Sequence, residues 1–343
     1  MLRATVGVAL SGGIIAALLW KADWAEVRAV FEQVSWWRVA PLPLIYLASF
    51  PLRGLRWQLM LRPLGKVPLA RSTAIVAVGY MANNLLPARL GEFVRAGVLR
   101  QSEGISGVSA FTSIVTERVF DGLTLAAILV WTMQGLPADA SYADHLDRLA
   151  YAVSMGFSAA LLAILLARLL PRQIRRATSW LTAWLPERMR SRLDRAVDSA
   201  LSSVTFLRSG GAVLAVAGLS ATVWLFEGAM FWCGLWAFGL PADLRLALFT
   251  LAVVNFGALL PSAPGYVGVF QAGALVAFAA HGLGVELALG YSITVPAMQF
   301  IPITLVGAVV LTRLGLSLKS LRHLGRSHRP KTTDPTEPSS SDG

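Results

Sequence analysis

The sequence has few charged residues and almost no cysteine. Only 14% of its 343 residues are charged, against roughly 25% in a soluble domain. Cys233 is the single cysteine and only four residues are histidines, so neither a disulfide framework nor a zinc-ligand pattern is present. The sequence also contains no P-loop, GxSxG or HExxH motif. We therefore exclude a soluble domain, expect neither a cofactor nor a metal, and disfavour an ATP-driven pump.

Long apolar runs predict an all-α integral membrane protein. Crossing ~30 Å of hydrocarbon takes about 20 apolar residues. The predicted spans are residues 4–20, 39–61, 108–134, 149–170, 211–239 and 286–312. Two further runs, 73–99 and 246–281, are broken by proline and glycine. Broken helices occur at membrane depth only where protein or water covers the freed backbone groups. We therefore predict six full spans and two re-entrant helical hairpins in a membrane domain over 1–315.

Charge in the loops predicts the orientation. Basic residues gather in 171–210 and after 313, which places both segments and both termini in the cytoplasm. The aspartate-bearing loop 135–148 suits the outside. These placements agree only if the two hairpins do not cross the membrane and enter from opposite sides. The formal net charge of +11 then indicates attraction to anionic lipid and not to nucleic acid.

Two further segments outside the spans are distinctive. Residues 177–207 alternate tryptophan and leucine with arginine near helical spacing, which predicts an amphipathic segment at the membrane interface. Residues 316–343 form a tail that is first basic and then polar, and its end is expected to be disordered.

Short repeats support an inverted arrangement of the hairpins. LLPARLG at 85–91 and LLPSAPG at 259–265 share Leu-Leu-Pro with glycine four residues after the proline. Asn84 and Asn255 lie just upstream of these repeats. Inverted-topology repeats place their binding site at the repeat interface near mid-membrane, so we expect a site between the two hairpins.

Charged residues cluster where charge is costly. NLLPARLGEFVR at 84–95 and TERVFD at 116–121 lie in or beside apolar segments. An ionisable side chain there costs several kcal/mol unless it is paired or faces water. The cluster consists of Arg89, Glu92, Arg95, Glu117, Arg118 and Asp121. We interpret it as a polar site inside the membrane.

The first hairpin suggests an anion site. Pro87 should end the incoming half-helix, and a new one should begin near Leu90–Gly91, where unpaired N–H groups favour phosphate or carboxylate. Arg89 precedes this end, and Glu92 and Arg95 share one helix face. The functional interpretation is a cradle for an anionic headgroup. The alternative is an Arg–Glu–Arg network that only holds the hairpin tip.

The TERVFD segment places two carboxylates on one helix face. Glu117 and Asp121 repel each other unless a cation or a proton intervenes. Arg118 can pair with Asp121, and Arg89 or Arg95 with Glu117. These groups either recognise a headgroup ammonium or couple to protons, or they form a structural ion network.

Charges elsewhere in the apolar runs are fewer. Glu227 is alone in its run, so it should be neutral or face a cavity, and a site role is one interpretation of it. Arg53 and Arg56 lie near the inner end of the second span, and we expect them to snorkel to the interface.

The second hairpin has no charge. PSAPGYVGVFQ at 261–271 begins like a half-helix, with Pro264 and Gly265 near its start. Gly265 and Gly268 permit close approach either of a headgroup or of another helix. Gln271 is a candidate polar lining residue.

NNLLPARLGEFVRAGVL, TERVFDGLTL and PSAPGYVGVFQAGAL together resemble the lysylphosphatidylglycerol synthase/flippase transmembrane family, over about residues 5–315. The resemblance implies re-entrant helices, inverted repeats, and translocation of a lipid or handling of a lipid-linked substrate. The family's motif positions fall on Pro87, Arg89, Gly91, Glu92, Arg95, Glu117, Arg118, Asp121, Pro264 and Gly265. The chain departs at Gln271, where relatives often carry glutamate. Because the soluble aminoacyltransferase domain is not seen after the last span, lysyl-lipid synthesis is not expected.

The leading hypothesis is a non-enzymatic lipid translocase of a bacterial inner membrane. Its partners would be membrane lipids with an anionic or zwitterionic headgroup, and a homo-oligomer or an envelope-synthesis partner remains open. The alternatives are an intramembrane lipid-pyrophosphate phosphatase and a non-transporting accessory subunit of an envelope-synthesis complex. Against the phosphatase, no serine, threonine or histidine stands next to Arg89, although a glutamate-activated water would suffice.

Overall fold

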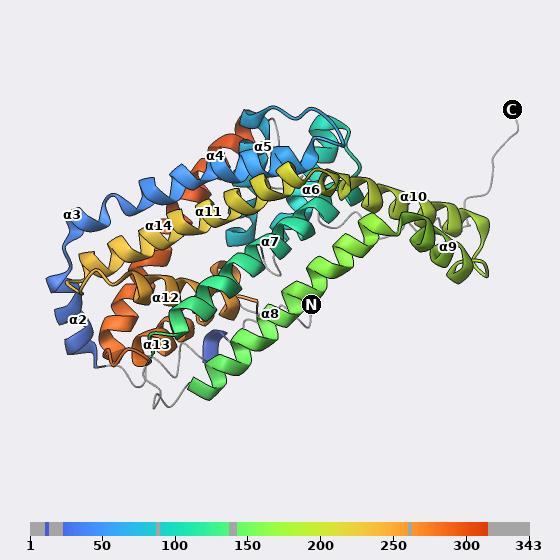
Figure 1. Cartoon of the computed structure of the whole chain (residues 1–343). Helices are drawn as coiled ribbons and strands as arrows, with labels where there is room; N and C mark the ends of the chain where they lie inside the picture. The colour runs from blue at the N-terminus through green and yellow to red at the C-terminus, as the bar shows by residue number, and fades with distance from the viewer. Residues whose placement is uncertain (1–10, 14–22, 87–89, 137–142, 260–262, 315–343) are drawn as a thin grey trace, which may run out of the picture.

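The computed structural model describes residues 11–13, 23–86, 90–136, 143–259 and 263–314, which form helices and no strand (Figure 1). The α-helices are α2 (Trp24–Gln33), α3 (Trp36–Val39), α4 (Leu42–Leu61), α5 (Leu69–Leu85), α6 (Gly91–Glu103), α7 (Gly107–Met133), α8 (Ala143–Leu169), α9 (Pro171–Leu181), α10 (Glu187–Ser203), α11 (Gly210–Ala237), α12 (Leu244–Gly257), α13 (Val269–Ala279) and α14 (Val285–Arg313). The described residues also include two 3₁₀ helices, η2 (Thr205–Arg208) and η3 (Pro264–Tyr266).

Three of the described helices are long and apolar enough to cross a membrane. They are Asp144–Leu169 in α8, Gly210–Ala237 and Val285–Arg313. Helix α7 has 27 residues, as α8 does, but Glu117, Arg118 and Asp121 stand in its middle. Helix α4 covers the predicted span 39–61 from residue 42 onward. Most of the predicted first span, 4–20, and all of the tail 316–343 lie outside the described residues.

The long helices pack as a bundle. Helix α4 packs against both α5 and α11, and α14 packs against α5 and α4 (Figure 1). Small residues allow close helix contact without a large side chain between the backbones. At Gly307 of α14, for example, an added Cβ would lie 3.0 Å from the carbonyl oxygen of Ala77 in α5. Helix α7 packs against α6, α8, α11 and α12, so its charged centre faces several elements.

Each predicted hairpin segment folds as two packed helices. Helix α5 packs against α6, and α12 against α13. Helix α6 begins at Gly91, where the sequence predicts a new half-helix. Between α12 and α13 the chain turns through Gly265 and Gly268, whose φ angles are +75° and +88°. Glycine adopts these conformations without steric cost, which explains glycine at both positions.

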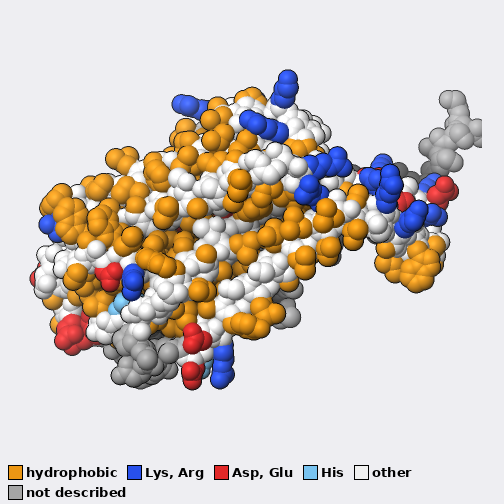
Figure 2. All heavy atoms as spheres, viewed as in Figure 1, with side chains coloured by type: hydrophobic (Ala, Val, Ile, Leu, Met, Phe, Trp, Pro, Cys, Tyr) orange, Lys and Arg blue, Asp and Glu red, His pale blue; other side chains and the backbone are white. Residues whose placement is uncertain are grey.

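Helices α9 and α10 form an arm beyond the end of α8, to one side of the bundle (Figure 1). Pro171 at the first turn of α9 cannot continue α8. The predicted amphipathic segment 177–207 therefore contains the end of α9, all of α10 and most of η2. The arm meets the bundle at its inner end, where Ser109 of α7 donates to the Ser199 carbonyl oxygen at 2.8 Å. Figure 2 shows apolar side chains gathered at its outer end.

Candidate functional site

The centre of the bundle contains a buried ion cluster built around Arg56. Its Nη2 donates to Glu117 Oε1 at 2.9 Å, and its Nη1 donates to Asp121 and, at 2.8 Å, to Ser220 Oγ. The Arg56 side chain has no exposed surface and that of Glu117 is 1% exposed. A guanidinium buried this deeply is tolerable only because several acceptors surround it.

Arg95 ties α6 to the same carboxylate. Its Nη2 donates to Glu117 Oε2 at 2.9 Å and its Nη1 to Oε1 at 3.2 Å. This two-point geometry fixes the angle as well as the distance between the groups. The Arg95 guanidinium also lies 4.3 Å from the ring centre of Trp57, and Trp57 Nε1 donates to Ser113 Oγ at 3.0 Å. Glu117 therefore joins α4, α6 and α7 at one point.

A second buried pair connects α4 to α11. Arg53 Nη2 donates to Glu227 Oε1 at 2.5 Å, and Arg53 Nη1 donates to the Tyr80 hydroxyl at 2.5 Å. Trp224, one turn before Glu227, donates from Nε1 to Asp121 Oδ1 at 3.0 Å. The contacts of Arg56 and the Arg53–Glu227 pair therefore belong to one network across five helices. We call its charged members the ion cluster: Arg53, Arg56, Arg95, Glu117, Arg118, Asp121 and Glu227.

Arg118 is where the ion cluster reaches the surface. Its side chain is 35% exposed, whereas the other members are at most 8% exposed. Arg118 lies 3.3 Å from Glu117 Oε1 and 3.6 Å from Asp121 Oδ2. Its Nη2 also donates to the Tyr80 hydroxyl at 3.5 Å.

Glu92 of α6 carries the opposite charge within electrostatic range of Arg118. Glu92 Oε1 accepts from Asn83 Nδ2 at 3.3 Å. Among the described residues, buried Glu92 Oε2 and Arg118 Nε have no hydrogen-bond partner. Arg118 and Glu92 therefore each have one polar atom without a partner, as Arg56 and Arg95 also have at Nε. We call Arg118, Glu92 and Tyr80 the cluster's mouth.

One expectation about charge is wrong. Arg53 and Arg56 do not snorkel, because their side chains are 1% and 0% exposed and both are paired. Glu227, alone in its own apolar run, has Arg53 of α4 as its partner. The expected pairs of Arg95 with Glu117 and of Arg118 with Asp121 are present. The missed signal is the spacing of Arg53 and Arg56, which puts two bases on one helix face with no local acid.

The start of α6 is also less open than expected. The Gly91 N–H donates to Asn83 Oδ1 at 2.7 Å, so the first donor of this half-helix already has a partner. Gly91 is required here, because an added Cβ would clash with the Gly79 carbonyl oxygen of α5 and with Asn83. Pro87 and Arg89, both predicted site residues, lie outside the described residues.

The other predicted site residues make contacts away from the ion cluster. Asn84 donates to Thr304 Oγ1 at 3.0 Å, and Asn255 donates within its own helix to Leu251 O at 2.9 Å. Gln271 accepts from the Gly268 N–H at 2.7 Å and donates to Ser292 O at 3.2 Å. In the described part of the chain, these residues stabilise helix ends and contacts.

Pro264, Gly265 and Gly268 have different structural roles in the second hairpin. At Gly268 an added Cβ would lie 2.9 Å from the Ser11 carbonyl oxygen. That contact supports close approach of another segment of the chain. Gly265 provides the turn in η3, and Pro264 begins η3.

Comparison with known proteins gives one family and two partial relatives. The family model described as "Lysylphosphatidylglycerol synthase TM region" matches residues 5–307. The protein named "Glycosyltransferase AglD" of Haloferax volcanii is 34% identical over 161 residues, which cover 45% of this chain and 26% of that protein. A "UPF0104 membrane protein" of Methanothermobacter thermautotrophicus is 29% identical over 124 residues, covering 34% of this chain and 36% of that protein. No solved structure matches significantly.

Proposed function

We propose that this protein translocates lipids. The chain belongs to the lysylphosphatidylglycerol synthase TM region family, and it is therefore a multi-pass membrane protein. The substrate would be a phospholipid or a polyprenyl-linked lipid whose headgroup passes through the protein while its tails stay in the bilayer. The mouth of the ion cluster supports this proposal most strongly. It offers Arg118 to a phosphate and Glu92 to an ammonium or hydroxyl group of the headgroup.

The proposed topology has six spans and two re-entrant hairpins. The pairs α5–α6 and α12–α13 would enter the membrane from opposite sides, as inverted repeats of the inner membrane, with both termini in the cytoplasm. One observation supports the re-entrant part of this arrangement. The paired helices are short, with 17 and 13 residues in the first pair and 14 and 11 in the second. An α-helix needs about 20 residues to cross the hydrocarbon layer.

The buried part of the ion cluster would hold the residues of the mouth in a fixed position. Glu117 and Asp121 each contact Arg118 and at least one fully buried arginine. A headgroup phosphate that binds Arg118 competes for a guanidinium already shared by two carboxylates. Binding would therefore loosen Arg118 from α7 and couple occupancy to small shifts among the five helices. Alternating exposure of the mouth would follow from rocking of the two repeats.

The relative named a glycosyltransferase favours a second candidate function. The match to that protein covers 26% of its length, so its named activity need not reside in the shared segment. The shared segment would instead handle a lipid-linked sugar in the membrane. For this chain, the second candidate is a membrane module that binds or moves a lipid-linked sugar for a partner enzyme.

Transport of fluorescent lipids in proteoliposomes tests the proposal. Purified protein would be reconstituted with short-chain fluorescent phosphatidylglycerol, phosphatidylethanolamine or a polyprenyl-phosphate sugar. A membrane-impermeant reductant would then report how much probe reaches the outer leaflet. We expect at least one probe to flip, and we expect Arg118→Gln to slow it at least tenfold by removing the exposed phosphate donor.

Arg28→Gln is the matched control, because Arg28 is 83% exposed in a surface pair with Glu32. It should flip lipid at the wild-type rate. Wild-type transport by Arg118→Gln, or no transport of any probe by the unmodified protein, would contradict the proposal. Chemical breakdown of a probe would instead support a lipid-cleaving enzyme.

A further inference from the structure

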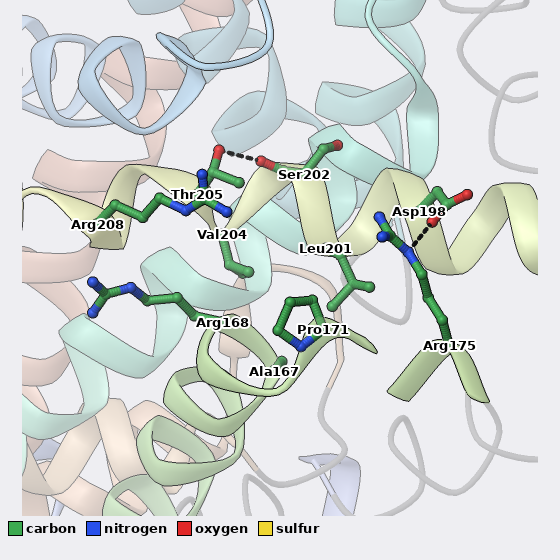
Figure 3. Close-up of a pocket in the computed structure, with 10 residues that line it drawn as sticks. All are labelled: Ala167, Arg168, Pro171, Arg175, Asp198, Leu201, Ser202, Val204, Thr205 and Arg208. Carbon is green, nitrogen blue, oxygen red and sulfur yellow. Dashed lines mark hydrogen bonds and ion pairs between the residues drawn. The ribbon is translucent and has the colours of Figure 1, made fainter. Parts of the chain in front are cut away.

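A pocket of about 210 Å³ lies where α8 ends and the arm begins. Its lining comes from α8, α9, α10 and η2, so it shares no residue with the ion cluster. Figure 3 shows Arg168 and Arg208 on one side of the pocket and Arg175 with Asp198 on the other. The lining residues are Ala167, Arg168, Pro171, Arg175, Asp198, Leu201, Ser202, Val204, Thr205 and Arg208.

The pocket carries an excess of positive charge. Three arginines and one aspartate line it, which gives a formal charge of +2. Arg175 Nε donates to Asp198 Oδ1 at 2.7 Å, so the one acid of the lining is already engaged. Arg168 and Arg208 contribute two guanidinium groups from different helices. A concave site with several planar donors suits a phosphate group better than a single surface arginine does.

The position of α8 places this pocket at the depth of lipid headgroups. The apolar span Asp144–Leu169 has 26 residues, and only 6% of its most apolar window is buried inside the protein. At 1.5 Å per residue, this helix is roughly 39 Å long, which exceeds the ~30 Å of hydrocarbon. Arg168 stands in its last turn. The pocket is therefore beside the membrane surface, next to a helix that faces lipid along most of its length.

The arm carries an apolar face that suits the same surface. Trp180 is 77% exposed, Leu181 60% and Trp184 81%. Tryptophan favours the membrane interface, and an amphipathic helix with an arginine-rich face binds anionic leaflets. With these side chains inserted among lipids, the arm would hold headgroups next to the pocket.

We propose that this pocket binds the phosphate of an anionic phospholipid from the leaflet that the arm contacts. Arg168 and Arg208 donate to the phosphate oxygens, and Asp198 keeps Arg175 at the opposite wall. The bound lipid is a fixed component that seats the arm against the bundle. It is not the translocated substrate, because the pocket lies apart from the ion cluster.

Lipid titration followed by native mass spectrometry tests this site. Full-length protein in a non-ionic detergent would be titrated with phosphatidylglycerol or phosphatidylcholine of the same chain length. We expect a first phosphatidylglycerol to bind roughly tenfold more tightly than phosphatidylcholine, since charge-assisted hydrogen bonds favour the lipid with net negative charge. The double variant Arg168→Gln/Arg208→Gln should abolish this preference.

The control variant Arg188→Gln/Arg190→Gln removes the same charge from exposed positions of α10 outside the pocket. It should keep the preference within about twofold, because neither residue lines the pocket. Equal losses in both double variants would show attraction by general surface charge and overturn the proposal. An unchanged preference in the pocket variant would overturn it as well. Displacement of the lipid by millimolar inorganic phosphate would assign the pocket to a free anion.

Arg208→Gln alone covers the case in which the double variant does not fold. Arg208 is exposed, so the fold should tolerate its loss, and about half of the preference on a logarithmic scale should disappear. Retention of the full preference by a folded Arg208→Gln protein would contradict a phosphate contact by Arg208. This lipid titration is independent of lipid transport, because it measures binding in detergent and not flipping.

Discussion

The bundle and the arm use arginine in opposite ways. In the bundle, the Arg56 side chain is 0% exposed and contacts two carboxylates, while Arg95 is 2% exposed and contacts one. In the arm, Arg175 is 57% exposed, and so is its partner Asp198. Arginine is thus part of a buried network in the bundle and of a solvent-exposed surface in the arm.

This contrast separates internal from external roles. Removing charge from water carries a desolvation cost of several kcal/mol per ion, and only well-placed opposite charges offset it. Exposed pairs avoid that cost but contribute only about 0–1 kcal/mol. The bundle arginines therefore hold helices to one another. The arm arginines contribute little to the fold, and their charge remains directed at the surroundings.

The largest effect is expected from Arg56→Met. Methionine fills similar space, but it leaves Glu117 and Asp121 with fewer cations at the centre of the bundle. Breaking a buried pair in this way costs about 3–5 kcal/mol. The thermal unfolding midpoint of the purified protein in detergent should fall sharply, or the protein should fail to accumulate.

Arg62→Met, at the exposed end of the same helix, is its control. It should change the unfolding free energy by no more than about 0.5 kcal/mol. If the Arg56→Met and Arg62→Met proteins have the same thermal unfolding midpoint, the buried network does not stabilise the bundle. The bundle and the arm would then not differ in this respect.

An intermediate effect is expected where both members of a buried pair are removed. Arg53→Leu or Glu227→Leu alone leaves one buried charge without its partner and should cost about 3–5 kcal/mol. The double variant should recover most of that loss, since replacing a whole buried pair by apolar groups is often neutral. A thermodynamic cycle of unfolding free energies measures the coupling. Additive losses would show that Arg53 and Glu227 act independently.

The local features of the ion cluster were predictable from the sequence, and the long-range ones were not. Arg118 and Asp121 are three residues apart on one helix, so their pairing follows from helix geometry. The start of α6 follows from the proline just before it. Arg53 and Glu227 are 174 residues apart, and their contact depends on α4 packing against α11. No periodicity in either segment encodes that neighbour relation.

The buried arginines and the buried acids differ in how far the sequence predicts their surroundings. Buried acids were expected to need partners, but Arg53 and Arg56 were expected to reach water along their own side chains. Their position explains the difference. Arg53 and Arg56 face Trp224, Ser220 and α7 inside the bundle, so neither has a route to the interface. The sequence shows that these residues lie toward one end of an apolar run, but only the packing of α7 and α11 shows which face is covered.

The smallest effect is expected in the arm. Arg175→Gln breaks an exposed pair and should change the unfolding free energy by about 0.5 kcal/mol or less. High salt should shrink even this difference, because it screens exposed charges within a few ångströms. Unfolding midpoints measured at low and at high salt would check both statements. A salt-independent loss of more than about 2 kcal/mol would place this pair energetically with the ion cluster. A small loss of unfolding free energy would mean that the arginines of the arm do not stabilise the fold appreciably. Contact with anionic lipid then becomes the physical reason for their charge.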